Sequence, residues 1–200
     1  RVPAEAGVSA LLQLSGVSRH FGGLKAVSEV DLSVERGEVI GLIGPNGAGK
    51  TTLFNLITGV HRATAGTVRF AGEDVTRQKP WQAARRGIAR TFQIVQPFPE
   101  MTVLENVAAA ALFAGGMAYG KRADAAALEH LRFVGLADVA ATRAATLTLA
   151  MRKRLELAKG LAMNPQLLLL DEVNAGLNST EIDHALALIR AIAARGITIL

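Results

Sequence analysis

The chain has 200 residues, half of them hydrophobic and a fifth charged, which is typical of one globular domain, or of one domain with a lobe, and excludes a disordered chain. The net charge of +5 comes from basic residues in short scattered groups, and aromatic side chains make up 4% of the chain, so we expect no nucleic-acid partner. The sequence contains no cysteine, which excludes disulfides and thiolate sites.

Strand-like and turn-like segments fill the first third of the chain. Residues 27–44 contain two candidate strands that are broken at Arg36 and Gly37. A helix is expected from Lys50 to Val60, and the segments GTVRF (66–70) and GIARTF (87–92) are expected to be further strands.

The character of the sequence changes at residues 101–150, where 16 of 50 residues are alanine. Because alanine is the strongest helix former, we expect a helical subdomain, from about residue 95 to 155, inserted into a mixed sheet domain. The longest apolar stretch, residues 107–120, has 14 residues, fewer than the roughly 18 that a membrane-spanning helix needs. Any membrane role therefore has to run through a partner.

Helices and strands alternate in the last quarter of the chain. A helix from Met151 to Met163, a buried strand from Leu167 to Leu170, a helix from Thr180 to Arg195 and an apolar run at 197–200 are expected. This alternation predicts an α/β fold with a mostly parallel sheet. The first residue is Arg1 and the final run stops at Leu200, so we expect residues 1–200 to be a single domain truncated at its C-terminus.

A glycine-rich segment, GLIGPNGAGKTTLFNL, lies between the second candidate strand and the first expected helix. Gly44, Gly49, Lys50 and Thr51 match the phosphate-binding pattern G-x-x-x-x-G-K-[ST]. The glycines let backbone N–H groups point at the β- and γ-phosphates, Lys50 adds a positive charge, and the Thr51 hydroxyl is suited to bind Mg²⁺. The pattern predicts a bound nucleotide.

An acidic pair follows the apolar run that ends at Leu170. Asp171 and Glu172 would stand at the carboxyl end of a buried parallel strand, where open α/β sheets place their ligand sites. Alone, the pair would be interpreted as a solvated strand end. Beside a phosphate loop, we expect Asp171 to hold Mg²⁺ through water and Glu172 to be the general base that activates water.

In their order along the chain, GPNGAGKTT, LLLLDE and AGLN resemble the nucleotide-binding subunits of ABC transporters, over essentially the whole sequence. The resemblance implies a P-loop NTPase fold of the ABC-ATPase type, with a mixed sheet core, an antiparallel β part and the inserted helical subdomain. It implies that Gln93 contacts Mg²⁺ and the water site, that Phe21 stacks on adenine, and that residues 175–178 cross to a second copy.

The segments RTFQIVQPFPEMTVLENV and FGGLKAV resemble the branched-chain amino acid subgroup of these ATPases more closely. The resemblance implies an importer component on the cytoplasmic face of the inner membrane, which works with membrane permease subunits and a second ATP-binding subunit. Pattern and resemblance together assign catalysis to Glu172, Gln93 and Lys50, and Mg²⁺ binding to Thr51, Gln93 and Asp171. They assign ATP contacts to Phe21, Gly44, Pro45, Asn46, Gly47, Ala48, Gly49, Lys50, Thr51, Thr52, Thr148 and Ala150.

The signature of the family, Leu-Ser-Gly-Gly-Gln, is replaced here by LTLAM at residues 147–151. Thr148 keeps a hydroxyl, but Leu149 and Ala150 replace both glycines and Met151 replaces the glutamine. In the family this helix N-terminus meets the γ-phosphate bound by the other copy. Because Ala150 adds a Cβ and tolerates fewer backbone conformations than glycine, we expect a weakened site; the alternative is an inactive one.

Two further positions depart from the family pattern. Val173 stands where the family usually has proline, and the sequence stops at Leu200, before the place where the family has its switch histidine. The histidines present also lack the spacing of a metal site; they are His20, His61, His130 and His184. The resemblance therefore implies nucleotide binding with slow turnover by these 200 residues.

Two other functions stay open at this point. One is a non-transport ABC ATPase that acts on nucleic acid or ribosomes, although such proteins usually carry long insertions or tandem copies, and neither occurs in this sequence. The other is a nucleotide-sensing module with little turnover, which is favoured if LTLAM inactivates the site.

Overall fold

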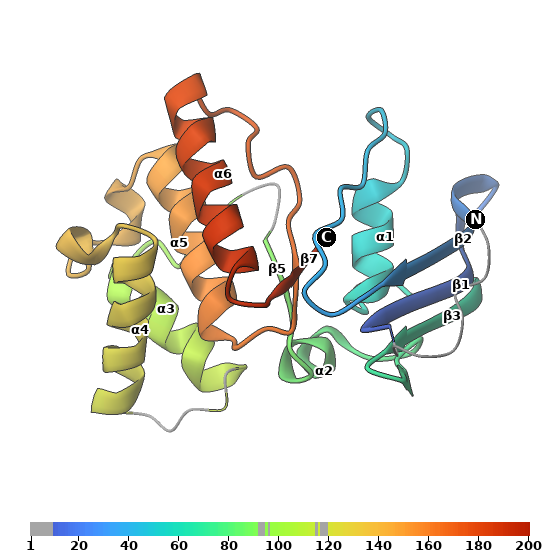
Figure 1. Cartoon of the computed structure of the whole chain (residues 1–200), viewed down its shortest axis with the longest axis horizontal. Helices are drawn as coiled ribbons and strands as arrows, with labels where there is room; N and C mark the ends of the chain where they lie inside the picture. The colour runs from blue at the N-terminus through green and yellow to red at the C-terminus, as the bar shows by residue number, and fades with distance from the viewer. Residues whose placement is uncertain (1–9, 92–94, 96, 115, 117–119) are drawn as a thin grey trace. The chain divides into compact units, whose positions relative to one another are not determined.

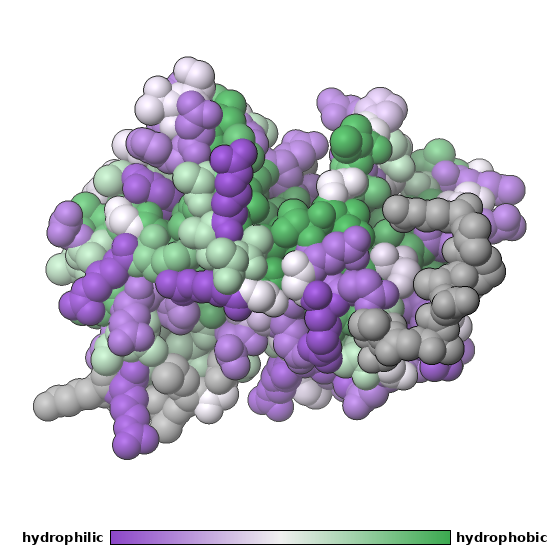
Figure 2. All heavy atoms as spheres, viewed as in Figure 1, coloured by the Kyte–Doolittle hydropathy of each residue, from purple (hydrophilic) through white to green (hydrophobic). Residues whose placement is uncertain are grey.

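The computed structural model describes residues 10–91, 95, 97–114, 116 and 120–200 (Figure 1). The described residues form two compact units. The first contains the chain up to Ala83 together with Thr198–Leu200, and the second contains Ala84–Ile197. Figure 2 shows hydrophilic side chains on the visible face of each unit, interspersed with apolar ones.

The first unit is built on an antiparallel sheet with the strand order β2-β1-β3-β4. Its strands are β1 (Leu12–Phe21), β2 (Leu24–Val34), β3 (Ala65–Phe70) and β4 (Glu73–Asp74). Buried Leu12 and Leu14 alternate with exposed side chains along the start of β1, the pattern of a strand with one face against a core. This sheet confirms the predicted antiparallel part.

Helix α1 (Lys50–Ile57) buries its apolar side chains in the same unit and contacts β2. It starts at the residue predicted from the sequence. It ends three residues before Val60, and Gly59 follows in a left-handed conformation with φ 75°, which terminates the helical path. The short helix α2 (Pro80–Arg85) follows later in the chain.

The second strand expected within residues 27–44 is reduced to a single bridge. Val39 pairs in parallel with Ile199 of β7 (Thr198–Ile199), and the Ile40 N–H donates to the Ile199 carbonyl oxygen at 2.9 Å. Strand β7 has only two residues, so it can pair with the segment before the glycine-rich loop over a short length only. Among the described residues, that segment therefore forms no regular strand. The expectation of a full strand there was wrong.

In the second unit the parallel strands β5 (Ile88–Arg90) and β6 (Leu167–Leu169) pair in register, with Arg90 opposite Leu169. All three residues of β6 are buried, as the continuous apolar run predicts. Two 3₁₀ turns, η1 (Ala137–Val139) and η2 (Ala144–Thr146), lie before the fifth helix.

Three helices of the second unit pack against one another: α3 (Val103–Phe113), α4 (Lys121–Phe133) and α5 (Leu149–Ala162). Helices α3 and α4 bury alanines 108, 111, 123 and 127, and small side chains of this kind let helices approach closely. The predicted helical character of residues 101–150 is confirmed, and the bounds 95–155 of the inserted subdomain stay a prediction. In the part of the chain that the structure describes, no helix has the length and apolarity to cross a bilayer.

Helix α6 (Ser179–Ala193) follows the acidic pair. Its N-cap is Asn178, which forms a capping box with Glu181: the Asn178 side chain accepts from the Glu181 N–H at 3.0 Å, and the Glu181 carboxylate accepts from the Asn178 N–H at 2.9 Å. The helix therefore begins one residue earlier than the predicted Thr180.

Candidate nucleotide-binding and catalytic site

The glycine-rich loop of the first unit has a backbone that only glycine adopts without strain at two places. Gly47 and Gly49 have φ of 82° and 86°. A Cβ on Gly49 would stand 2.3 Å from the carbonyl oxygen of Ala26, so the loop also approaches β2 too closely for a side chain. The Ala48 N–H donates to the Pro45 carbonyl oxygen at 3.2 Å and closes the turn between them.

The N-terminus of α1 suits an anion. Its N-cap, Gly49, has no capping side chain, and the first turn contains no acidic residue. The partial positive charge of the helix end is therefore not offset by a carboxylate within the first turn, which favours a phosphate group at this position. Thr51 is exposed and Thr52 half-buried at the start of this helix.

Lys50 bends back over the loop that precedes it. Its ammonium donates to the carbonyl oxygens of Gly44, at 2.6 Å, and Pro45, at 2.9 Å. The charge is thus held at the loop rather than in solvent, while Pro45, Asn46 and Ala48 are exposed. The loop combines a positive charge, a helix N-terminus and left-handed glycines, and these residues fit a phosphate chain.

Phe21 lies at the end of β1 in the same unit and is 39% exposed. The guanidinium carbon of Arg19 lies 4.4 Å from the centre of its ring, and the His61 ring meets it edge-on at a centroid distance of 5.3 Å. An aromatic ring held in this way offers a flat surface for a base. Its contact with adenine stays a prediction.

Asp171 directly follows β6 in the second unit and is 4% exposed. Its Oδ2 lies 2.9 Å from Nη2 of Arg90, which is also buried, in a salt bridge across the two parallel strands. The Asp171 N–H donates to the Thr91 hydroxyl at 3.3 Å. The ends of β5 and β6 thus fix a buried carboxylate, an oxygen ligand of the kind that Mg²⁺ prefers.

Glu172 is exposed and has φ of 48°, a left-handed conformation that is uncommon for a residue with a side chain. Its carbonyl oxygen accepts from the Ala175 N–H at 3.1 Å and from the Lys153 ammonium at 3.2 Å. Burial lowers the pKa of Lys153, and the negative charge of Glu172 opposes that shift. The backbone of Glu172, the predicted general base, is therefore strained, and Lys153 of α5 holds it in place.

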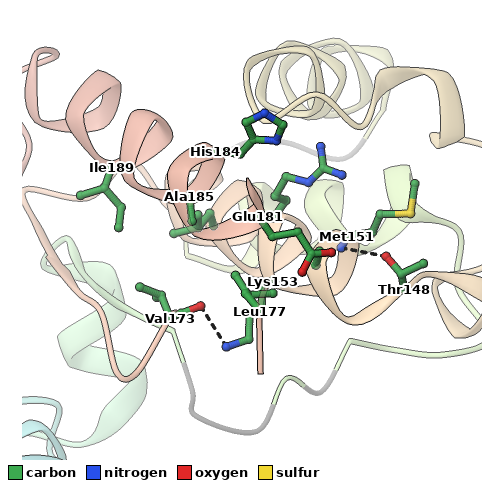
Figure 3. Close-up of a pocket in the computed structure, with 12 residues that line it drawn as sticks. Thr148, Met151, Lys153, Val173, Leu177, Glu181, His184, Ala185 and Ile189 are labelled. Carbon is green, nitrogen blue, oxygen red and sulfur yellow. Dashed lines mark hydrogen bonds between the residues drawn. The ribbon is translucent and has the colours of Figure 1, made fainter. Parts of the chain in front are cut away.

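A cavity of about 230 Å³ lies beside this turn, between α5, residues 173–177 and α6 (Figure 3). Apolar side chains of Leu157, Leu177 and Ile189 contribute to its lining, together with the polar side chains of Lys153 and His184. Thr148 and Met151 line it at the end of α5 that carries the altered signature.

The altered signature forms the N-terminus of α5. Thr148 is the N-cap, and its hydroxyl accepts from the Met151 N–H at 3.3 Å. Leu149 and Ala150 are helical and neither has a positive φ, so this backbone does not need glycine at either place. A Cβ on Gly176 would stand 3.0 Å from the Leu149 side chain, which shows that the added leucine packs beside the 175–178 segment.

Replacing Thr148 by alanine should lower the free energy of unfolding by about 1 kcal/mol, because α5 loses its N-cap. Thermal unfolding should show a melting temperature lower by roughly 2–4 °C. Thr148→Ser keeps a capping hydroxyl and should melt within about 1 °C of the wild-type chain. Equal losses in both variants would show that the methyl group, rather than the hydroxyl, supports this helix end.

The structure places the other predicted residues in both units, except for one. Gln93 lies outside the described residues. His20 and His61 belong to the first unit, and half-buried His130 and exposed His184 to the second. The described residues contain no group of three or more histidine, aspartate or glutamate side chains that could hold a metal ion by themselves. The phosphate loop lies in the first unit, and Asp171, Glu172 and Thr148 lie in the second.

A model of the ABC transporter family matches residues 27–175. The chain belongs to the ABC transporter family. This membership confirms the predicted fold class and identifies the chain as an ATP-binding cassette, since the matched region contains both the phosphate loop and the acidic pair.

Relatives of the cassette agree with this assignment. BraF of Pseudomonas aeruginosa, a high-affinity branched-chain amino acid transport ATP-binding protein, is 41% identical over 193 residues, which cover 90% of this chain and 75% of BraF. LivG of Escherichia coli, which has the same description, is 39% identical over 196 residues, covering 90% of this chain and 77% of LivG.

Solved structures of other cassettes have the same fold. An ATP-binding cassette of an ABC transporter in an ADP conformation has a TM-score of 0.88 at 32% identity, covering 96% of this chain and 80% of that one. A dimeric cassette in a post-hydrolysis state with ADP and phosphate has a TM-score of 0.82 at 26% identity, covering 94% of this chain and 85% of that one.

Sequence reasoning missed two residues that hold the acidic pair of the cassette. Arg90 pairs with Asp171, and Lys153 donates to the carbonyl oxygens of Glu172 and Val173. The signal for Arg90 was a charged residue at the end of an otherwise apolar strand. The role of Arg90 depends on β5 and β6 being neighbouring strands, and a local sequence pattern does not predict which strands are neighbours.

Proposed function

We propose that this cassette binds ATP with Mg²⁺ and hydrolyses it to drive the uptake of branched-chain amino acids through membrane permease partners. The observation that carries the proposal is a phosphate loop that leads into an uncapped helix N-terminus, in the same chain as a buried carboxylate followed by an exposed, strained glutamate. The solute class is supported by the descriptions of BraF and LivG.

The loop residues 44–51 would bind the phosphate chain through their backbone N–H groups. Lys50 is suited to exchange its bonds to the Gly44 and Pro45 carbonyl oxygens for phosphate oxygens, because its ammonium is already held at the loop. Phe21 would support the adenine ring by stacking. The oxygens of Thr51, Gln93 and Asp171 would hold Mg²⁺, which supplies charge neutralisation at the phosphates.

The salt bridge from Arg90 leaves Asp171 in a defined orientation, since it engages Oδ2. Glu172 would take a proton from the attacking water as the general base. Its left-handed backbone supports this role, since strained conformations gather at active sites.

The full site would need two copies of the cassette. The N-terminus of α5, with the Thr148 hydroxyl and the N–H groups of the first turn, would meet the ATP bound by the second copy. A hydroxyl that accepts one hydrogen bond still has its own proton to donate, so the cap at Met151 does not prevent this contact. The helical backbone of Leu149 and Ala150 favours a working site over an inactive one.

We further propose that the cassette is a peripheral subunit at the cytoplasmic face of the membrane, bound through the permeases. The 200 residues contain no histidine after His184, so we expect slow turnover from these residues alone. A chain that includes the switch histidine should hydrolyse ATP faster without a matching gain in ATP binding.

Glu172→Gln should reduce ATP hydrolysis at least 100-fold while ATP binding is retained, because a general base contributes about 10²- to 10⁴-fold. The assay is phosphate release by the cassette assembled with its permease partners in vesicles, with leucine uptake measured in parallel. ATP-dependent dimers should accumulate on size-exclusion chromatography.

Glu129→Gln, a change at an exposed glutamate of α4, is the matched control and should leave hydrolysis unchanged. Wild-type hydrolysis rates in the Glu172→Gln variant would exclude the proposed general base. If ATP is hydrolysed but leucine, isoleucine and valine are not taken up, the proposed ATPase activity stands and branched-chain amino acids are excluded as the transported solutes.

A further inference from the structure

Lys153 connects α5 to the turn that follows the acidic pair. Its ammonium donates to the carbonyl oxygen of Glu172 at 3.2 Å. It also donates to the carbonyl oxygen of Val173 at 2.9 Å, the bond drawn as a dashed line in Figure 3. These two carbonyls belong to successive residues, so one side chain fixes the peptide unit that joins Glu172 to Val173 together with the next one. The bonds join residues 19 and 20 positions apart in the sequence.

The peptide unit held in this way adjoins a strained residue. Glu172 has φ of 48°, and such a conformation persists only where its surroundings determine it. On one side the Asp171 N–H is anchored on the Thr91 hydroxyl at 3.3 Å, and on the other the Ala175 N–H donates to the Glu172 carbonyl at 3.1 Å. The backbone dihedrals of Glu172 set the direction of its side chain, so these bonds also aim its carboxylate.

The surroundings of the Lys153 ammonium make these hydrogen bonds important for the turn. Lys153 is half-buried and lines the cavity of about 230 Å³, whose apolar side chains include Leu157, Leu177 and Ile189. In Figure 3 the Lys153 side chain points toward Val173. The bond to the Val173 carbonyl is partly buried beside these apolar side chains, so water replaces the charged donor there only poorly, and the turn then relaxes.

We infer that Lys153 is a positioning residue for Glu172: through its bonds to the Glu172 and Val173 carbonyls it holds the left-handed turn that directs the general base. The inference rests on the proposed function of Glu172. The same side chain joins that base to α5, the helix that Thr148 caps and whose N-terminus is proposed to meet the second copy.

Lys153→Met keeps the length and apolar stem of the side chain and removes its three donors. Since misplacing a catalytic group by about 1 Å costs on the order of 100-fold, we expect kcat for ATP hydrolysis to fall about 10- to 100-fold. KM for ATP and the thermal shift caused by Mg-ATP should stay within about twofold of the wild type, because Lys153 lies outside the phosphate loop. Lys153→Arg supplies donors again and should recover much of the loss.

The matched control is Arg152→Met, one residue earlier on α5. Arg152 also donates to a backbone carbonyl, that of Ala145 at 2.8 Å, but this carbonyl is remote in sequence from the acidic pair. Its removal should change kcat less than threefold. A Lys153→Met kcat within threefold of the wild type, with the Mg-ATP thermal shift retained, would overturn the inference.

A double-variant cycle separates positioning from general support of the fold. In a Glu172→Gln background, Lys153→Met should cause no further loss of the residual turnover, because the group it positions is gone. A full further loss there would assign Lys153 a structural role and overturn the inference. If wild-type turnover does not depend on Glu172, the proposed function fails; if it depends on Glu172 but not on Lys153, only this inference fails.

Discussion

Lys50→Ala removes most of the thermal stabilisation that Mg-ATP gives the cassette. At a hundredfold excess over Kd, a bound ligand stabilises the folded state by about 2.7 kcal/mol, which is a rise in melting temperature of roughly 5–10 °C for a chain of this size. The Lys50 ammonium is the charged side chain that the structure places at the loop carbonyls of Gly44 and Pro45. Without it the triphosphate loses a charge-assisted contact.

The readout is the difference in melting temperature with and without Mg-ATP, because Lys50→Ala also removes two hydrogen bonds of the free loop and changes the melting temperature by itself. Lys79→Ala, at an exposed lysine of the same unit, controls for the loss of one positive charge and should keep the full shift. A shift that survives Lys50→Ala would mean that the nucleotide binds elsewhere.

Arg90→Met should lower the free energy of unfolding by about 3–5 kcal/mol, because it leaves the carboxylate of Asp171 buried without its cationic partner. Both side chains are at most 5% exposed and their charged atoms are 2.9 Å apart, so solvent cannot replace the lost interaction. The melting temperature should fall by roughly 6–20 °C, as measured by calorimetry or circular dichroism.

An exposed ion pair in the same unit provides the control. Arg143 lies 3.2 Å from Glu100, with side chains 69% and 79% exposed, and Arg143→Met should cost less than about 1 kcal/mol. The double variant Arg90→Met with Asp171→Leu should be more stable than Arg90→Met alone, since the buried carboxylate is removed together with its cationic partner. A double variant that is less stable than the single one would show that the pair is not the source of the effect.

The parts of the site that the sequence predicted are those with a local pattern. The loop glycines, Lys50 at the first position of α1 and the acidic pair after a buried strand follow from short-range rules on turns, helix starts and apolar runs. The helical character of residues 101–150 follows from alanine content in the same way.

What the sequence did not predict depends on which elements are neighbours. The salt bridge of Arg90 with Asp171 needs the parallel pairing of β5 with β6, and the bonds of Lys153 need α5 beside the turn at Glu172. The segment before the phosphate loop was expected to be a full strand, but its partner β7 supports one bridge at Val39. Helix α5 begins at Leu149, two residues before the predicted Met151, although Thr148, a favoured N-cap residue, was a local signal for the earlier start.

A crystal structure of the cassette with a nonhydrolysable ATP analogue and Mg²⁺ tests most directly where the nucleotide binds. We expect electron density for the triphosphate against the backbone N–H groups of residues 44–51, and one divalent ion that the Thr51 hydroxyl and the Asp171 carboxylate would both help to hold. Nucleotide density in any other pocket, or an ion bound without either of these two side chains, would contradict it.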